Sequence, residues 1–169
     1  GGSDFKYSNL SYEECADIIR KYVKAAPVEI LKFFRIIVFN YLTLNDDAHL
    51  KSFSLINRGD GEYHLAPAYD LINTSLHLSM PRIFALDKGL FKEGMKLTDT
   101  RTVERNDFEE FGRRIGLSER LVKRELNFFA AEHPLAKELI DRSFLSDSLK
   151  RSYWLSYKYR RATLTFTFN

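Results

Sequence analysis

The sequence predicts a mainly α-helical domain with a small β-hairpin inserted near residue 50. Three observations indicate this fold class. Apolar residues recur with the helical period, serines and prolines stand where helices begin, and two β-prone runs flank a glycine-containing turn. The chain has 169 residues, a length at which one hydrophobic core can support a domain. We therefore expect residues 1–169 to form a single domain.

The N-terminal part predicts two helices. Ser11 and Glu14 have the spacing of a capping box, which predicts a helix over about residues 12–24. Pro27 suits the first turn of a second helix, because its missing N–H has no intrahelical partner there. One face of this second helix is apolar at the helical period: Ile30, Leu31, Phe34, Ile37, Val38 and Tyr41. We expect it to be the central core helix, ending at the turn-forming residues Asn45–Asp47.

The hairpin is predicted from two short runs rich in strand-forming residues. Phe53–Ile56 and Glu62–Leu65 flank Asn57–Gly61, whose two glycines suit the positive φ values of a turn. Between residues 73 and 102 the pattern is less informative, and it indicates only a strand near residues 82–86 and loops at Gly89 and Gly94.

The C-terminal part predicts four more helices and a terminal strand. We expect Asp107 to cap a helix that runs to Ile115 and ends at Gly116 in the left-handed conformation. Ser118, Pro134 and Ser146 then begin helices that extend to about residues 131, 142 and 159. The tail, residues 163–168, alternates with period two and predicts a strand.

Composition excludes several classes of protein. The 44% hydrophobic and 29% charged residues exclude a disordered or collagen-like chain, and a net charge of +3 is too weak to indicate nucleic-acid binding. The single cysteine, Cys15, excludes an internal disulfide and a multi-cysteine zinc site. The most apolar stretch, residues 30–42, is interrupted by Lys32 and Arg35 and is too short to span a membrane. We expect a cytoplasmic protein without a membrane partner.

Charged and imidazole groups gather where the predicted core helix ends. Asp47, His49 and Lys51 would make a poor core segment, because unpaired buried charges are costly. The hairpin that follows can bring Asp47 and Asp70 into one cleft. Two carboxylates in this order fit phosphoryl transfer, in which one aspartate deprotonates the acceptor hydroxyl and the other holds Mg²⁺. Ser52 follows Asp47 at the spacing of the metal-binding Asn in protein kinases.

These two motifs resemble a known family. NDDAHLKSFSL followed by YHLAPAYDL resembles the HipA-like C-terminal domain of the serine/threonine kinases in bacterial toxin–antitoxin modules. The family pattern is Asp-x-His-x-Lys-Asn-Phe-Ser, a hairpin, and then Leu-x-Pro-x-Tyr-Asp. The match is strong over residues 38–73 and looser before and after them. The resemblance implies the helical C-lobe of a bilobal, protein-kinase-like fold.

The resemblance also implies a role for each matching residue. Asp47 would be the catalytic base, and the histidine two residues later fixes the register on Asp47 in preference to Asp46. Asp70 would ligate Mg²⁺, with Ser52 as a second ligand in place of the family's Asn. The nucleotide ATP would be contacted by His49, Lys51, Ser52, Tyr69 and Asp70.

Each of these residues also has a purely structural interpretation. Asp47 could be a turn residue at the end of a helix, and Asp70 could cap a helix beginning at Leu71. His49 could shape the loop through a hydrogen bond, Lys51 could be a solvated charge, and Tyr69 could be a wall of the cleft.

The resemblance leads to two hypotheses about function. In the first, the chain is the catalytic lobe of an ATP- and Mg²⁺-dependent serine/threonine protein kinase, with a protein substrate in translation and a small DNA-binding antitoxin as partners. No glycine-rich phosphate loop precedes the first predicted helix, so we expect the kinase N-lobe to be absent from this chain. In the second hypothesis, the chain is a degenerate kinase lobe that binds without catalysis, as Ser52 would suggest. An unrelated helical domain with a fortuitous match is the third possibility.

Overall fold

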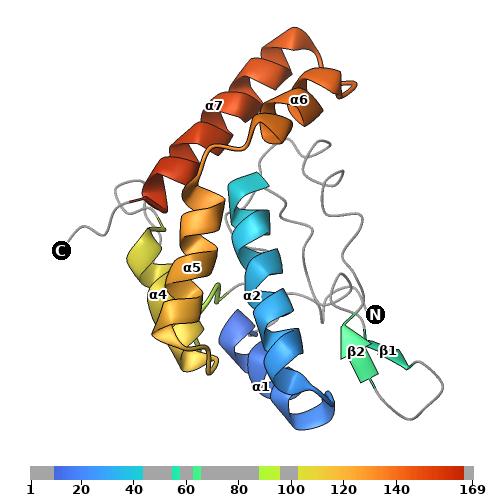
Figure 1. The fold of residues 1–169 in the computed structure, drawn as a ribbon, viewed down its shortest axis with the longest axis vertical. Helices are drawn as coiled ribbons and strands as arrows, with labels where there is room; N and C mark the ends of the chain where they lie inside the picture. The colour runs from blue at the N-terminus through green and yellow to red at the C-terminus, as the bar shows by residue number, and fades with distance from the viewer. Residues whose placement is uncertain (1–9, 44–54, 58–62, 66–87, 96–102, 166–169) are drawn as a thin grey trace.

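The computed structural model describes residues 10–43, 55–57, 63–65, 88–95 and 103–165, and within them the chain is mainly helical. The described helices are α1 (Tyr12–Tyr22), α2 (Ala26–Thr43), α4 (Arg105–Arg114), α5 (Glu119–Ala130), α6 (Pro134–Arg142) and α7 (Asp147–Thr163). In Figure 1, α2 lies beside α1 and α5, α4 pairs with α5, and α6 and α7 lie together beyond the C-terminal end of α2. No helix of the described part is long and apolar enough to cross a bilayer.

Helix α1 begins where the sequence predicts, and its N-terminus is fully capped. The Ser11 hydroxyl accepts a hydrogen bond from the Glu14 N–H at 3.1 Å, and the Glu14 carboxylate accepts one from the Ser11 N–H at 2.8 Å. This reciprocal pair satisfies two N–H groups that have no intrahelical partner. Ala25, with a φ of 58°, turns the chain directly into α2.

Helix α2 is the centre of the hydrophobic core, as predicted. Ile30, Phe34, Ile37, Val38 and Tyr41 are all buried, whereas Leu31 is only partly buried. Other side chains of α2 are buried on a second side, namely Phe33 and Leu42. Because α1, α5 and α7 all contact α2, the helix has more than one buried face and is more apolar than a single stripe would require.

Helices α4 and α5 pack closely against α2. Phe111 of α4 stacks on Phe34, with ring centroids 6.1 Å apart. A Cβ at Gly112 would lie 3.3 Å from Phe34 Cε2 and closer still to the methyl groups of Val122, so glycine permits this close approach. Gly116 ends the segment with a φ of 94°, as predicted.

The predicted cap of α4 is wrong. The helix begins at Arg105, and Asp107 lies inside its first turn, where its carboxylate accepts a hydrogen bond from the Glu104 N–H at 2.9 Å. An acidic side chain can satisfy an orphan N–H from either the cap position or the third helical position. Asp107 takes the second of these roles.

Ser118, Pro134 and Ser146 begin α5, α6 and α7 as predicted, but the predicted terminal strand is wrong where the structure describes it. Helix α7 continues to Thr163. Leu164 and Thr165 then form a turn, and their N–H groups bond to carbonyls of α7 itself. Leu164 is fully buried, so core packing holds these residues in a helical turn despite their alternating pattern. Residues 166–169 lie outside the described part.

Two three-residue strands, β1 (Leu55–Asn57) and β2 (Tyr63–Leu65), pair antiparallel, with Leu55 opposite Leu65 and Asn57 opposite Tyr63. Strand β2 lies beside α2 (Figure 1). The connecting residues 58–62 lie outside the described part, and therefore the predicted hairpin turn stays a prediction. The same holds for the strand predicted near residues 82–86.

Candidate active site

The six predicted site residues all lie outside the described part of the chain. Asp47, His49, Lys51 and Ser52 fall within residues 44–54, and Tyr69 and Asp70 fall within residues 66–87. Their mutual placement and their roles therefore stay predictions.

The structure does describe the elements that lead into and out of these two segments. Helix α2 ends at Thr43, just before the first motif, and β1 begins at Leu55, just after it. Strand β2 ends at Leu65, just before the second motif. Helix α2 precedes the first motif and strand β2 precedes the second, and these two elements contact each other.

The last turn of α2 is tied to two other parts of the chain through Tyr41. The Tyr41 hydroxyl donates to the Val103 carbonyl at 3.0 Å and lies 2.6 Å from the Thr163 hydroxyl of α7. The Tyr41 ring packs on Phe108 of α4, with centroids 5.1 Å apart. Burial is the main cause that raises the pKa of Tyr41, so the phenol stays protonated and able to donate.

Arg160 of α7 also contacts the last turn of α2, through both the backbone and the ring of Tyr41. Its Nη1 donates to the Tyr41 carbonyl oxygen at 2.8 Å, and its guanidinium carbon lies 5.0 Å from the centre of the Tyr41 ring. The last four carbonyls of a helix lack intrahelical donors, and a cation there also favours the helix dipole. Helix α2 has no basic residue in its own last turn, and Arg160 supplies one from α7.

Asn40, next to Tyr41, is a buried amide whose needs are unmet within the described residues. Its side chain is 5% exposed, and neither its oxygen nor its nitrogen has a hydrogen-bond partner there. Leaving a buried polar group unpaired costs about 1–3 kcal/mol.

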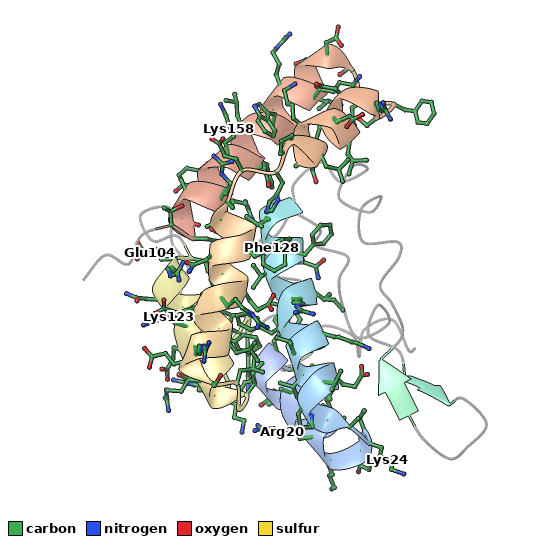
Figure 2. All side chains as sticks on the ribbon, in the orientation of Figure 1. Arg20, Lys24, Glu104, Lys123, Phe128 and Lys158 are labelled. Carbon is green, nitrogen blue, oxygen red and sulfur yellow. The ribbon has the colours of Figure 1, made fainter. Side chains whose placement is uncertain are left out.

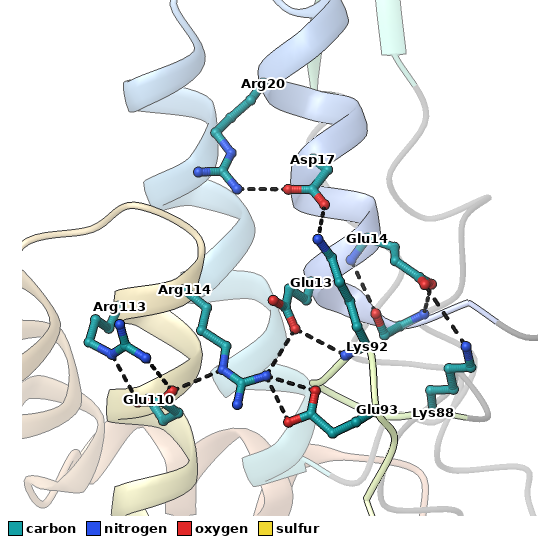
Figure 3. A network of polar contacts seen from close by, with 11 residues as sticks. Glu13, Glu14, Asp17, Arg20, Lys88, Lys92, Glu93, Glu110, Arg113 and Arg114 are labelled. Carbon is teal, nitrogen blue, oxygen red and sulfur yellow. Dashed lines mark hydrogen bonds and ion pairs between the residues drawn. The ribbon is translucent and has the colours of Figure 1, made fainter.

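A second polar cluster lies at the opposite end of the bundle, where α1, α4 and residues 88–93 meet (Figure 3). Arg114 joins the carboxylates of Glu13, Glu93 and Glu110 at 3.2, 2.8 and 2.9 Å. Hydrogen bonds from Arg113 and then from Arg114 lower the pKa of Glu110 to about 2. These groups satisfy one another, and they form a structural ion-pair network.

An apolar pocket of about 360 Å³, to which Phe128 contributes (labelled in Figure 2), lies beside the last turn of α2, between α5, α6 and α7. No charged side chain of the described residues lines it, and two of its polar groups have partners: His133 Nε2 lies 2.6 Å from the Phe128 carbonyl, and the Ser143 hydroxyl donates to the Ile140 carbonyl. The lining residues are Phe39, Leu42, Phe128, Phe129, His133, Leu135, Ala136, Leu139, Ile140, Ser143, Leu145, Tyr153 and Tyr157. A pocket without cations does not suit phosphate groups.

Other candidate groups in the described residues are structural. No three His, Cys, Asp or Glu side chains come together there in a way that could hold a metal ion. Cys15 is a core residue as predicted, and burial raises the pKa of its thiol to about 12. The tie between Tyr41 and Arg160 was not predicted. Arg160 stands in a basic stretch, and no local pattern distinguishes it from its neighbours.

Comparison with known proteins gives the family context. Residues 2–135 match the sequence model of the HipA-like C-terminal domain, and this range includes both motifs. A protein of Haemophilus influenzae named "Putative kinase" is 33% identical, over 69% of this chain and 36% of its own length. Two proteins of Sinorhizobium fredii, "Putative kinase Y4mE" and "Putative kinase Y4dM", are 24% and 28% identical.

The match covers 69% and 70% of this chain for these two relatives, but only 26% and 27% of their own lengths. The chain thus spans about a third or less of the relatives that it matches. Helix α7 lies beyond the residues matched by the family. With most of the chain matched, the protein belongs to the HipA-like C-terminal domain family.

Proposed function

We propose that this chain is the catalytic lobe of an ATP- and Mg²⁺-dependent serine/threonine protein kinase. One observation carries the proposal: both motifs occur in order, at the family's spacing, within the residues matched by the family. The kinase names of the relatives support the same class of reaction. The helical C-lobe is the corresponding proposal for the architecture.

The proposed chemistry divides the work between two aspartates. Asp47 would accept the proton of the substrate hydroxyl, and Asp70 would hold the metal ion, with Ser52 as a second oxygen ligand. Carboxylate and hydroxyl oxygens are hard donors of the kind that Mg²⁺ prefers, so this donor set fits the ion. When bound, Mg²⁺ neutralises charge on the nucleotide phosphates. His49 and Lys51 would contact the phosphates, and Tyr69 would line the nucleotide cleft.

The whole protein would have further parts and partners. The chain matches only a fraction of its relatives' length, and an N-terminal lobe that covers the nucleotide would complete the kinase. By family resemblance we further propose a toxin role, with a translation component as the substrate and a small DNA-binding antitoxin as the partner.

Substitution of Asp47 tests the proposed base. In the full gene product, we expect Asp47→Ala to slow transfer of the γ-phosphate by at least about a hundredfold, because general base catalysis contributes about 10²–10⁴-fold. Transfer of radiolabelled phosphate to protein measures the rate. Asp46→Ala is the matched control, with the same change one residue earlier, and it should retain the wild-type rate within a few-fold. Wild-type transfer by Asp47→Ala would overturn the assignment.

Ser52 favours a second candidate function, a binding module that has lost catalysis. A serine hydroxyl is a shorter and weaker metal ligand than the amide of the family's Asn. Calorimetry of nucleotide binding with and without Mg²⁺ separates the two candidates. A full gene product that binds ATP with Mg²⁺ but transfers no phosphate, even with Ser52→Asn, would be a binding module.

A further inference from the structure

We propose that α7 acts as a positioning element: Arg160 holds the last described turn of α2 and thereby restrains the start of the segment that carries the predicted catalytic base. The contacts themselves are independent of the reaction. The catalytic consequence rests on the proposed function, because it assumes that Asp47 is the base.

The geometry gives α7 two separate attachments to one residue. Arg160 donates to the main-chain carbonyl of Tyr41 at 2.8 Å, while Thr163, one turn later, lies 2.6 Å from the Tyr41 hydroxyl. The Thr163 hydroxyl also lies 2.6 Å from the Arg160 carbonyl, so when Tyr41 donates to Val103 the single Thr163 proton is shared between that carbonyl and the Tyr41 hydroxyl. Backbone and side chain of Tyr41 are therefore both held by the same turn of α7, which restricts rotation as well as displacement of the helix end.

The chemistry of Arg160 suits this position. The arginine combines a directed hydrogen bond to the Tyr41 main-chain carbonyl with a contact on the face of the Tyr41 ring. Burial lowers the pKa of Arg160, but a guanidinium remains charged in proteins. The cation at the C-terminal end of α2 therefore persists at any pH at which the protein is folded.

The attachment joins residues that are 119 positions apart, and only one of the two lies within the residues that match the family model. Tyr41 lies inside the family-matched residues 2–135, whereas Arg160 and Thr163 lie beyond them. The part of the chain outside the family match thus supports the turn that precedes the family's first motif.

Hydrogen exchange on the full gene product tests the attachment directly. Loss of a hydrogen bond to a charged group should increase opening of the turn by about tenfold or more. We therefore expect Arg160→Ala to speed amide exchange at least about tenfold in peptides that cover residues 41–50, and Arg160→Lys to give a smaller increase. Arg151→Ala is the matched control, because Arg151 is exposed on the same helix and should leave exchange unchanged.

Kinetics test the catalytic consequence. A misplaced base lowers the rate of the chemical step without removing contacts to the nucleotide. In Arg160→Ala we expect kcat to fall about tenfold or more and the KM for ATP to change less than about threefold. Arg160→Lys should recover part of kcat, since the lysine can still donate to the Tyr41 carbonyl.

The outcomes separate this inference from the proposed function. Faster exchange at residues 41–50 in Arg160→Ala, in a protein that never transfers phosphate, supports the attachment and overturns only the kinase proposal. Unchanged exchange overturns the attachment. An equal increase throughout the chain, α1 included, also overturns it, because Arg160 would then serve only global stability. If Arg160→Ala does not fold, Arg160→Lys and Tyr41→Phe decide by the same comparison.

Discussion

Two arginines at opposite ends of the helical bundle make different kinds of contact. Arg114, the last residue of α4, meets three partly exposed carboxylates, and they raise its pKa. Arg160 meets a main-chain carbonyl and an aromatic ring, and burial lowers its pKa. In the described residues, no carboxylate is among the groups that shift the pKa of Arg160. One end of the bundle is therefore a network of partly exposed ion pairs that share one arginine, and at the other end the Arg160 guanidinium has one acceptor among the described residues.

The difference shows how much geometry each end can fix. Exposed ion pairs are screened by water and salt, contribute about 0–1 kcal/mol each, and can rearrange among several partners. A cation that has one acceptor in a partly buried site has one favourable geometry. The Arg114 network can thus hold α1 and α4 together loosely, while Arg160 can define the place of a single turn. A loop that carries functional residues is positioned more precisely when the helix before it is held by a contact with one favourable geometry, such as that of Arg160.

The largest effect that follows concerns Cys15, on the α1 side of the network. Its pKa of about 12 leaves very little reactive thiolate at pH 8. We expect alkylation of native protein to be slower than in urea by about a thousandfold or more, from the pKa difference alone. Because the chain has a single cysteine, the mass increase reports this site unambiguously.

Cys15 labelling can then break the comparison of the two arginines. If α1 opens separately from the rest, Arg114→Met should speed labelling a few-fold, while Arg160→Met should leave it unchanged. Equal acceleration in both variants would mean that the bundle opens as a whole, and the distinction between its two ends would be lost.

The next effect concerns Asn40, beside the Arg160 attachment. Both polar atoms of its buried side chain lack partners in the described residues, whereas the carboxylates of the Arg114 network are paired. Asn40→Leu removes the unpaired amide at similar volume. We expect the free energy of unfolding, measured in urea, to rise by about 1–3 kcal/mol.

Asn40→Ala is the control, because it removes the amide but leaves a cavity, and it should gain less stability or lose some. A loss of stability in Asn40→Leu would show that the amide has a partner beyond the described residues. That result would place a second polar attachment at the end of α2, next to that of Arg160.

Local chemistry decided which parts of the fold could be predicted from sequence. The helix starts were predicted correctly from three serine caps, Ser11, Ser118 and Ser146, because a cap acts on N–H groups within three residues of itself. The start at Pro134 was predicted from the preference of proline for the first turn. Asp107 was misplaced because the same carboxylate can act from two positions. The tail was misread because its period-two pattern competes with burial of Leu164 against distant residues, which no local pattern contains.

The candidate site divides in the same way. Asp47 and Asp70 were found from the spacing of two motifs, and the family match supports the family without testing the role of either residue. Arg160 was missed because its importance arises from a contact with a residue 119 positions away. Sequence could name the chemistry of the loop, but only the fold shows what holds the helix that carries it.

The smallest effect is a pH dependence confined to the Arg114 end. Because Arg113 and Arg114 lower the pKa of Glu110 to about 2, its stabilisation is complete above the unfolded pKa of about 4.3 and is lost as pH falls toward 2. Glu110 is partly exposed, and screening should limit the effect to about 1 kcal/mol or less. Urea midpoints of wild type and Glu110→Gln should therefore differ at pH 6 and converge near pH 2.

The difference between wild type and Arg160→Met should stay constant over the same range, since no titrating carboxylate of the described part acts on Arg160. If both differences shrank together, the two ends would share one electrostatic network.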